Sequence, residues 1–134
     1  MSNLAARRVV AGANILVVED DAELLQLIGR ALEAAGHRVQ LAPSGEAGLR
    51  QFQADPPDLV VCDIVMPDRD GIELIPQMKA LKDEVKILAI SGRQMIGLLD
   101  VLNLALQLGA DSTLPKPFEL DNLVAHAEAL LPAR

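Results

Sequence analysis

The stretch Leu59-Val60-Val61-Cys62-Asp63-Ile64-Val65-Met66-Pro67 indicates the fold of this chain. Its first four residues are apolar, and such a run predicts a short strand that is buried on both faces. Pro67 and Gly71 mark the loop that follows the strand. Asp63 therefore ends a buried strand, where a carboxylate can be partly desolvated and still be reached from solvent.

Three other apolar runs also end in polar residues. Ile15–Val18 precedes Glu19-Asp20-Asp21, Ile87–Ile90 precedes Ser91-Gly92, and Leu114-Pro115 precedes Lys116. Because parallel strands bring their carboxyl ends to one edge of a sheet, we expect these polar groups to lie close together. Acids, a hydroxyl and a lysine in one place suggest a site for a cation and a phosphoryl group.

Strand and helix patterns alternate five times along the chain. This order predicts a doubly wound α/β domain with a parallel sheet, because right-handed helical crossovers cover both faces of such a sheet. The expected strands are 14–19, 38–42, 59–63, 86–90 and 112–114. The expected helices are 22–35, 44–53 with Ser44 as cap, 71–81 with Pro76 inside, 95–108 and 120–131. Residues 1–13 are expected to form a flexible extension before a domain of residues 14–131.

Composition limits the classes of partner. The chain has 134 residues, 51% of them hydrophobic, with two Phe and no Tyr or Trp, which predicts one domain with an aliphatic core. Its net charge of −7 argues against nucleic acid and anionic membranes as partners. No apolar stretch reaches the roughly 18 residues of a membrane span. The single cysteine, Cys62, is interpreted as a packed hydrophobic residue. One cysteine cannot form a disulfide within the chain, which fits a reducing cytoplasm.

Glu19, Asp20 and Asp63 are expected to share one small pocket. Two carboxylates ~4 Å apart repel by ~4 kcal/mol at an effective dielectric constant of about 20. Such a site raises a carboxyl pKa or binds a cation, and oxygen ligands with room for water suit Mg²⁺. Lys116 would supply a positive charge and Ser91 a hydroxyl donor for a phosphoryl group. Asp63 could then act as a nucleophile towards phosphorus and form an aspartyl phosphate.

Structural roles account for other polar residues. Asp21 is expected to cap the helix that follows it. Asp68 and Asp70 are interpreted as turn residues. His37 and His126 lie outside the acidic cluster and are interpreted as surface or helix-face residues.

The sequence from residue 14 to residue 131 resembles a response-regulator receiver domain. The motifs that carry the resemblance are Ile15-Leu16-Val17-Val18-Glu19-Asp20-Asp21, Asp63 with Met66-Pro67 and Asp70-Gly71, Ser91-Gly92, and Lys116-Pro117-Phe118. The resemblance implies a flavodoxin-like (βα)5 fold, with a five-stranded parallel sheet in the order 2-1-3-4-5.

The resemblance also implies a phosphorylation site. Asp63 would be the phospho-acceptor. Asp20, Asp63 and the backbone carbonyl of Val65 would bind Mg²⁺, and Glu19 would hold it directly or through water. The donor would be a histidine kinase or a histidine phosphotransfer protein.

Further roles follow from the resemblance at the next two strands. Ser91 would be the switch hydroxyl that moves onto the phosphoryl oxygen. Lys116 would pair with Asp63 or its phosphate, and the Lys116–Pro117 bond would be cis, a form found in ~5–6% of X–Pro bonds. Two features depart from the family pattern. Thr113 stands where receivers usually carry Tyr or Phe, and the segment 91–109 is longer and more apolar than usual.

The resulting hypothesis is a free-standing receiver that accepts a phosphoryl group and changes a surface made by the fourth helix, fifth strand and last helix. That surface would act on an unknown downstream protein, so the chain would be a signalling domain and not an enzyme. The alternative is a binding module that signals without phosphorylation, which Thr113 slightly favours. A phosphatase is disfavoured, because such enzymes usually carry a second Asp where Val65 stands. Val65 and Arg93 predict slow loss of the phosphate, since neither side chain can act as a base towards water.

Overall fold

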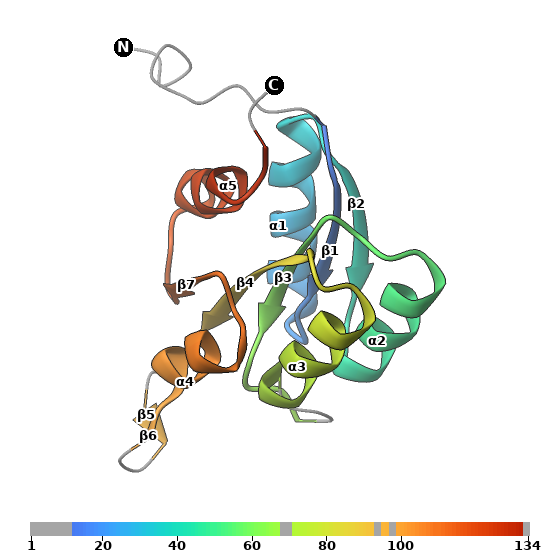
Figure 1. Ribbon diagram of the computed structural model, residues 1–134. Helices are drawn as coiled ribbons and strands as arrows, with labels where there is room; N and C mark the ends of the chain where they lie inside the picture. Colours follow the sequence, from blue (N-terminus) through green and yellow to red (C-terminus); the bar gives the residue numbers. More distant parts are fainter. Residues whose placement is uncertain (1–11, 68–70, 93–94, 97–98, 133–134) are drawn as a thin grey trace.

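The computed structural model describes residues 12–67, 71–92, 95–96 and 99–132. Its central feature is a parallel sheet with the strand order β2-β1-β3-β4-β7 (Figure 1). The strands are β1 (Asn14–Val18), β2 (Arg38–Ala42), β3 (Leu59–Asp63), β4 (Lys86–Ser91) and β7 (Ser112–Pro115). This arrangement confirms the predicted doubly wound fold and the order 2-1-3-4-5 of the five main strands.

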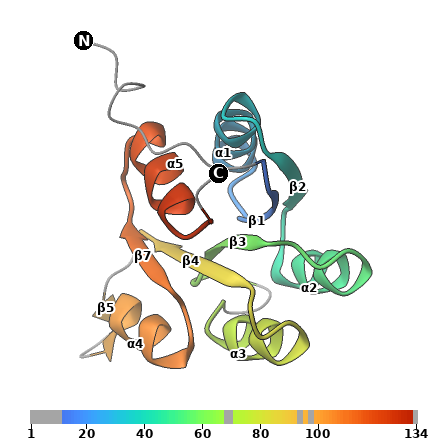
Figure 2. The same cartoon turned by 45° about the horizontal axis from the view of Figure 1, so that its top comes forward.

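Helices cover both faces of the sheet (Figure 2). They are α1 (Ala22–Ala34), α2 (Gly45–Ala54), α3 (Gly71–Leu81), α4 (Val101–Leu108) and α5 (Leu120–Ala129). In β1, Ile15 and Val17 pack with α1 and α5, whereas Leu16 and Val18 pack with α2 and α3. All four side chains are fully buried, which explains why this strand is a continuous apolar run.

Two of the predicted helix caps are confirmed. The Asp21 carboxylate accepts hydrogen bonds from the backbone N–H groups of Glu23 and Leu24, at 3.0 and 3.2 Å. Ser44 Oγ accepts from Ala47 N at 3.1 Å. These side chains satisfy N–H groups that have no partner within the helix. The Asp21 side chain is therefore engaged at the start of α1.

The single helix predicted for 95–108 is wrong. The structure has two short antiparallel strands there, β5 (Met95–Ile96) and β6 (Leu99–Asp100), and α4 begins only at Val101. Asp100 explains this late start, because its side chain accepts a hydrogen bond from the backbone N–H three residues on, at 3.1 Å. The apolar character of the whole segment concealed this cap. The other element boundaries agree with the prediction to within two residues.

His37 is not the surface residue that was predicted. Its exposed fraction is 5%, and its Nε2 lies 2.9 Å from Glu128 Oε2 on α5. The two residues are 91 positions apart, so no local pattern could reveal the pair. His126 lies on α5, where its ring Nδ1 is 2.8 Å from Asn122 O, which agrees with its predicted place on a helix face.

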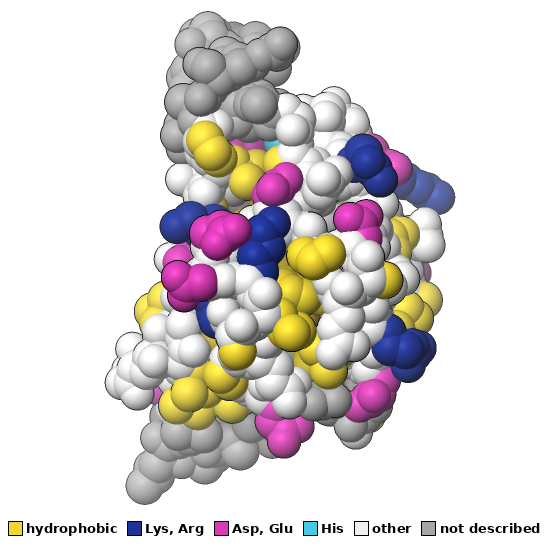
Figure 3. Space-filling model, turned by 45° about the vertical axis from the view of Figure 1, so that its right-hand side comes forward, with side chains coloured by type: hydrophobic (Ala, Val, Ile, Leu, Met, Phe, Trp, Pro, Cys, Tyr) yellow, Lys and Arg dark blue, Asp and Glu magenta, His cyan; other side chains and the backbone are white. Residues whose placement is uncertain are grey.

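The surface carries charges of both signs. On the face drawn in Figure 3, lysine and arginine side chains are interspersed with acidic ones rather than gathered in one patch. Within the described part of the chain, no helix is long and apolar enough to cross a membrane.

Candidate functional site

Asp63 lies at the carboxyl end of β3, in the middle of the sheet. Its Cα partner across the ladder is Ile90, so Ser91 on β4 is one residue further along the neighbouring strand. Both Asp63 and Ser91 are buried, with exposed fractions of 4% and 0%. The strand ladder thus brings the predicted acceptor and the predicted hydroxyl to the same edge.

Gly71 makes the turn after β3 possible. Its N–H donates to Ile64 O at 3.1 Å, and a Cβ placed on it would lie 2.6 Å from Asp63 O. Only a residue without a side chain tolerates this approach. Gly71 therefore brings the start of α3 directly against the backbone that carries the predicted acceptor, Asp63.

Two donors orient the Asp63 carboxylate. Val65 N–H donates to Oδ1 at 3.1 Å, and Lys116 Nζ donates to Oδ2 at 3.0 Å. Each oxygen has a different partner, so the carboxylate is held in one orientation. The Val65 main chain is therefore already part of the site, although its predicted role as a metal ligand through the carbonyl remains a prediction.

Glu19 is the second buried carboxylate of the site. Its Oε2 accepts from Asp21 N at 3.0 Å, and its Oε1 lies 2.7 Å from Lys116 Nζ. Oε1 is buried and has no hydrogen bond of good geometry, despite the short distance to the lysine. This oxygen therefore retains lone pairs that a cation could use.

The three predicted acidic residues converge. Glu19, Asp20 and Asp63 each offer a carboxylate oxygen, and these oxygens lie within 4.8 Å of one another. Glu19 and Asp63 are buried, whereas Asp20 is exposed, so the group is open to solvent on one side. An oxygen-only donor set with an open side fits Mg²⁺, which prefers a few carboxylates together with water.

Burial and charge set the protonation of the site. Burial raises the pKa of Glu19 above the ordinary carboxyl value, and the Asp63 charge adds to this. Lys116 and the Asp21 N–H offset it only in part. For Lys116, burial alone would lower the pKa, but its close contacts with the Glu19 and Asp63 carboxylates and their negative charges outweigh burial and raise the pKa. The lysine thus stays cationic between two carboxylates.

The loop after β7 positions Lys116. Its N–H donates to Ser91 O at 2.8 Å, and Ser91 is paired with Pro115 across the ladder. The Lys116–Pro117 bond is cis, which confirms the prediction. Thr113 lies further back on β7, half-buried and paired with Ala89.

Some residues of the prediction cannot be compared with the structure, and one residue near the site was not predicted. Asp68, Asp70 and Arg93 lie outside the described residues. Leu24 of α1 was not predicted, yet together with Gly92, Lys116, Pro117 and Phe118 it lines a concavity of about 350 Å³ beside the lysine. No sequence signal marks Leu24, because its role comes from the packing of α1 next to the loop after β7.

A comparison with known families identifies the chain. The model of the "response regulator receiver domain" family matches residues 15–128. The chain belongs to the response regulator receiver domain family. This confirms the resemblance seen in the sequence and places the receiver domain in two-component signalling.

Relatives and solved structures agree with this assignment. The receiver domain is 38% identical to response regulator MprA of Mycolicibacterium vanbaalenii over 117 residues, which cover 87% of this chain and 49% of MprA. MprA of Mycobacterium tuberculosis strain H37Ra gives the same identity, over 50% of its length. The chain thus spans about half the length of the curated relatives it matches.

Two solved structures share the fold closely. A CheY-like receiver domain protein from Methanospirillum hungatei has a TM-score of 0.82 and 28% identity, covering 90% of this chain and 94% of that one. NtrX from Brucella abortus, in complex with ADP, has a TM-score of 0.82 and 30% identity. There the match covers 90% of this chain but 27% of NtrX.

Proposed function

We propose that this receiver domain accepts a phosphoryl group on Asp63 from a phosphohistidine of a histidine kinase or phosphotransfer protein. The observation that carries the proposal is the buried Asp63 carboxylate, held by Lys116 beside two further acidic residues. In the transfer, an Asp63 oxygen forms the new bond to phosphorus and the phosphorus–nitrogen bond of the phosphohistidine breaks. The electron pair of that bond goes to the imidazole nitrogen, and the product is an aspartyl phosphate.

Each neighbouring side chain has a distinct task in this proposal. Lys116 offsets charge on Asp63 and pairs with the phosphoryl group once it has arrived. Ser91 donates its hydroxyl to a phosphoryl oxygen. Glu19, Asp20 and Asp63 would hold Mg²⁺, with the carbonyl of Val65 as a further ligand. The ion would supply positive charge that lets a phosphoryl group approach three carboxylates.

The phosphorylated site would act on a downstream protein through the surface of α4, β7 and α5. Lys116 and Ser91 connect the site to this surface, because Lys116 follows β7 and Ser91 leads into the segment before α4. Thr113 cannot act as the aromatic residue of other receivers does. We therefore assign the coupling to the backbone at the ends of β4 and β7. The lone cysteine fits a cytoplasmic location.

A small phosphodonor tests the proposal directly. The chain is incubated with acetyl phosphate, with and without Mg²⁺, and its mass is measured intact. We expect one added phosphoryl group that needs Mg²⁺, and none in the Asp63→Asn protein, which lacks the anionic nucleophile. Lys116→Ala should weaken the labelling or uncouple it from the conformational change. Asp83→Asn removes an exposed carboxylate from the turn after α3 and should be labelled normally.

A second candidate function is a binding module that keeps the fold and signals without phosphorylation. The absence of the aromatic side chain at Thr113 favours it, whereas the complete acidic set disfavours it. The same labelling experiment separates the two. A wild-type chain that takes up no phosphoryl group with Mg²⁺ present would support the binding module, and label that persists in Asp63→Asn would move the acceptor elsewhere.

A further inference from the structure

A buried polar pair lies at the far end of the sheet from Asp63. His37, in the turn between α1 and β2, and Glu128, on α5, have exposed fractions of 5% and 4%. Their side chains meet at 2.9 Å, between His37 Nε2 and Glu128 Oε2. Neither residue takes part in the phosphoryl transfer proposed above, so their burial needs another explanation.

A third group fixes the proton on the imidazole. Ala13 N–H donates to His37 Nδ1 at 3.1 Å. A ring nitrogen that accepts a hydrogen bond carries no proton, so the proton of the neutral ring is on Nε2 and is donated to Glu128. Neutral His37 thus accepts from the entrance of β1 and donates to α5, which joins the two elements through one side chain.

The groups around the His37 imidazole determine the effect of adding a second proton to the ring. Among the described residues, Glu128 is the charged group in contact with the imidazole, and it also makes contacts besides this one. The entrance of β1 presents the Ala13 amide rather than a charge, and α1 presents Leu32 O, which accepts from the His37 main chain. The next residue, Arg38 on β2, is exposed.

We propose that His37 is a protonation switch that ties the entrance of β1 to α5 when neutral and releases it when cationic. In the cationic ring both nitrogens are donors. Nδ1–H would then face the Ala13 N–H, two donors would oppose each other, and that bond is lost. The bond to Glu128 is kept and becomes an ion pair, because the proton taken from solvent makes the ring an imidazolium beside the carboxylate.

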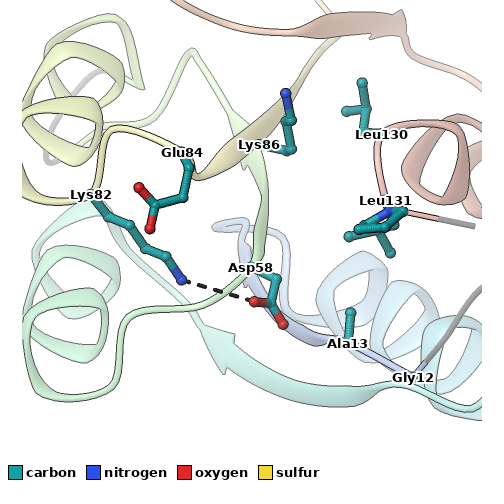
Figure 4. Close-up of a pocket in the computed structure, with 9 residues that line it drawn as sticks. Gly12, Ala13, Asp58, Lys82, Glu84, Lys86, Leu130 and Leu131 are labelled. Atoms are coloured by element: carbon teal, nitrogen blue, oxygen red, sulfur yellow. Dashed lines mark ion pairs between the residues drawn. The ribbon is translucent and has the colours of Figure 1, made fainter.

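Release at Ala13 would reshape a pocket without disturbing the sheet. Gly12 and Ala13 form one part of the wall of a cavity of about 430 Å³, and Leu130 and Leu131 form another (Figure 4). The change would be limited to the Ala13 amide and Gly12, because Ala13 O accepts from Arg38 N at 2.9 Å and Asn14 N–H donates to Asp58 Oδ2 at 2.9 Å. Protonation would thus alter one wall of the pocket.

Nuclear magnetic resonance of the ¹⁵N-labelled chain, titrated between about pH 8 and pH 5, tests the switch. We expect the ring proton on Nε2 at the upper end of the titration. As His37 becomes cationic, the exchange protection of the Ala13 amide, corrected for base catalysis, should fall about fivefold, as expected for one hydrogen bond. Finding the proton of the neutral ring on Nδ1 would overturn the proposal. It would also be overturned if the exchange protection of the Ala13 amide and the His37 ring signals changed at different pH midpoints.

Two variants and one control sharpen the test. Gln in His37→Gln offers an oxygen and an N–H but cannot titrate, so the pH dependence of Ala13 protection should disappear. His126→Gln removes the other histidine of the chain and should leave that dependence intact. If the exchange protection of the Ala13 amide still depends on pH in the His37→Gln protein, the proposed switch is wrong. If His37→Gln does not fold, the tautomer and the shared midpoint in the wild-type chain still decide.

Discussion

Cys62 and Asp63 are consecutive residues of β3 with opposite chemical character. Asp63 has a lysine partner at the edge of the sheet, whereas Cys62 is fully buried within the strand. Burial raises the pKa of the Cys62 thiol far above its ordinary value, and the charges of Asp63 and Glu19 act in the same direction. The thiol is therefore a packing group, as predicted, and carries no reactivity of its own.

This burial predicts that Cys62 is protected from thiol reagents. The folded chain should not react with iodoacetamide at mildly alkaline pH, and it should react fully in denaturant, as read by mass spectrometry. The folded thiol keeps its proton where the unfolded one loses it. Stability should therefore be unaffected below the ordinary thiol pKa and fall as the pH rises above it. Cys62→Ala should lack this part of the alkaline loss; labelling of the native chain at the unfolded rate would contradict the prediction.

A second prediction concerns Val65, which we expect to limit the access of water to a phosphoryl group on Asp63. Its half-buried apolar side chain lies two residues after the acceptor and offers no hydrogen bond to a water that attacks phosphorus. Val65→Asn should therefore hasten loss of the phosphoryl group by about tenfold, a modest part of what positioned polar groups contribute. The decay of the acyl phosphate is followed by intact mass. Val65→Ala is the control, because it opens space for water without adding a polar group. Comparing the two variants distinguishes the effect of water access from that of a new hydrogen bond. Equal decay in wild type and Val65→Asn would refute this role.

The sequence was informative for residues that end a strand. Asp63, Glu19 and Lys116 each follow an apolar run, and the parallel sheet brings such positions together by geometry alone. The His37–Glu128 pair follows from no such rule. It depends on how α5 packs against the turn after α1, which becomes visible only in three dimensions.

At the scale of elements, local hydrogen bonds set boundaries that periodicity alone does not show. The 95–108 segment has apolar residues at helical spacing throughout, yet the Asp100 cap places the start of α4 at Val101. Helix α3 shows the reverse case. It continues from Gly71 to Leu81 with Pro76 inside it, so packing of the helix outweighs the loss of one backbone hydrogen bond.

Pro76 therefore offers a test of that balance. The side chain is exposed, so Pro76→Ala removes little packing and restores a backbone N–H that can bond to Ile72 O. We expect the free energy of unfolding to rise by about 1–2 kcal/mol, less than the full cost of a helix-interior proline because the unfolded chain also gains freedom. Urea denaturation measures this free energy of unfolding. Glu73→Gln, a substitution at an exposed position of the same helix, should change the free energy of unfolding by less than about 0.5 kcal/mol. A loss of stability in Pro76→Ala would show that the ring stabilises α3.

At the scale of the whole molecule, the acidic cluster should link Mg²⁺ to stability. The three carboxylates repel one another in the folded chain and separate in the unfolded one, so a cation that binds only the folded state stabilises it. At a Mg²⁺ concentration of about ten times Kd, the free energy of unfolding should rise by about 1.4 kcal/mol. Thermal unfolding with and without Mg²⁺ measures the gain. Asp20→Asn should remove most of the stabilisation by Mg²⁺, and the control Asp83→Asn should remove none of it. If Mg²⁺ leaves the Tm of the wild-type chain unchanged, the site is not assembled as described.

The lack of an aromatic side chain at Thr113 has an optical consequence. With no Tyr or Trp anywhere in the chain, the protein absorbs and emits almost nothing in the near ultraviolet. Phe118 lies two residues after Lys116 and is half-buried in the concavity beside it. A tryptophan placed there by Phe118→Trp would be the sole fluorophore of the chain. Its emission would report events at the proposed phosphorylation site against a dark background, with no tyrosine or second tryptophan to subtract.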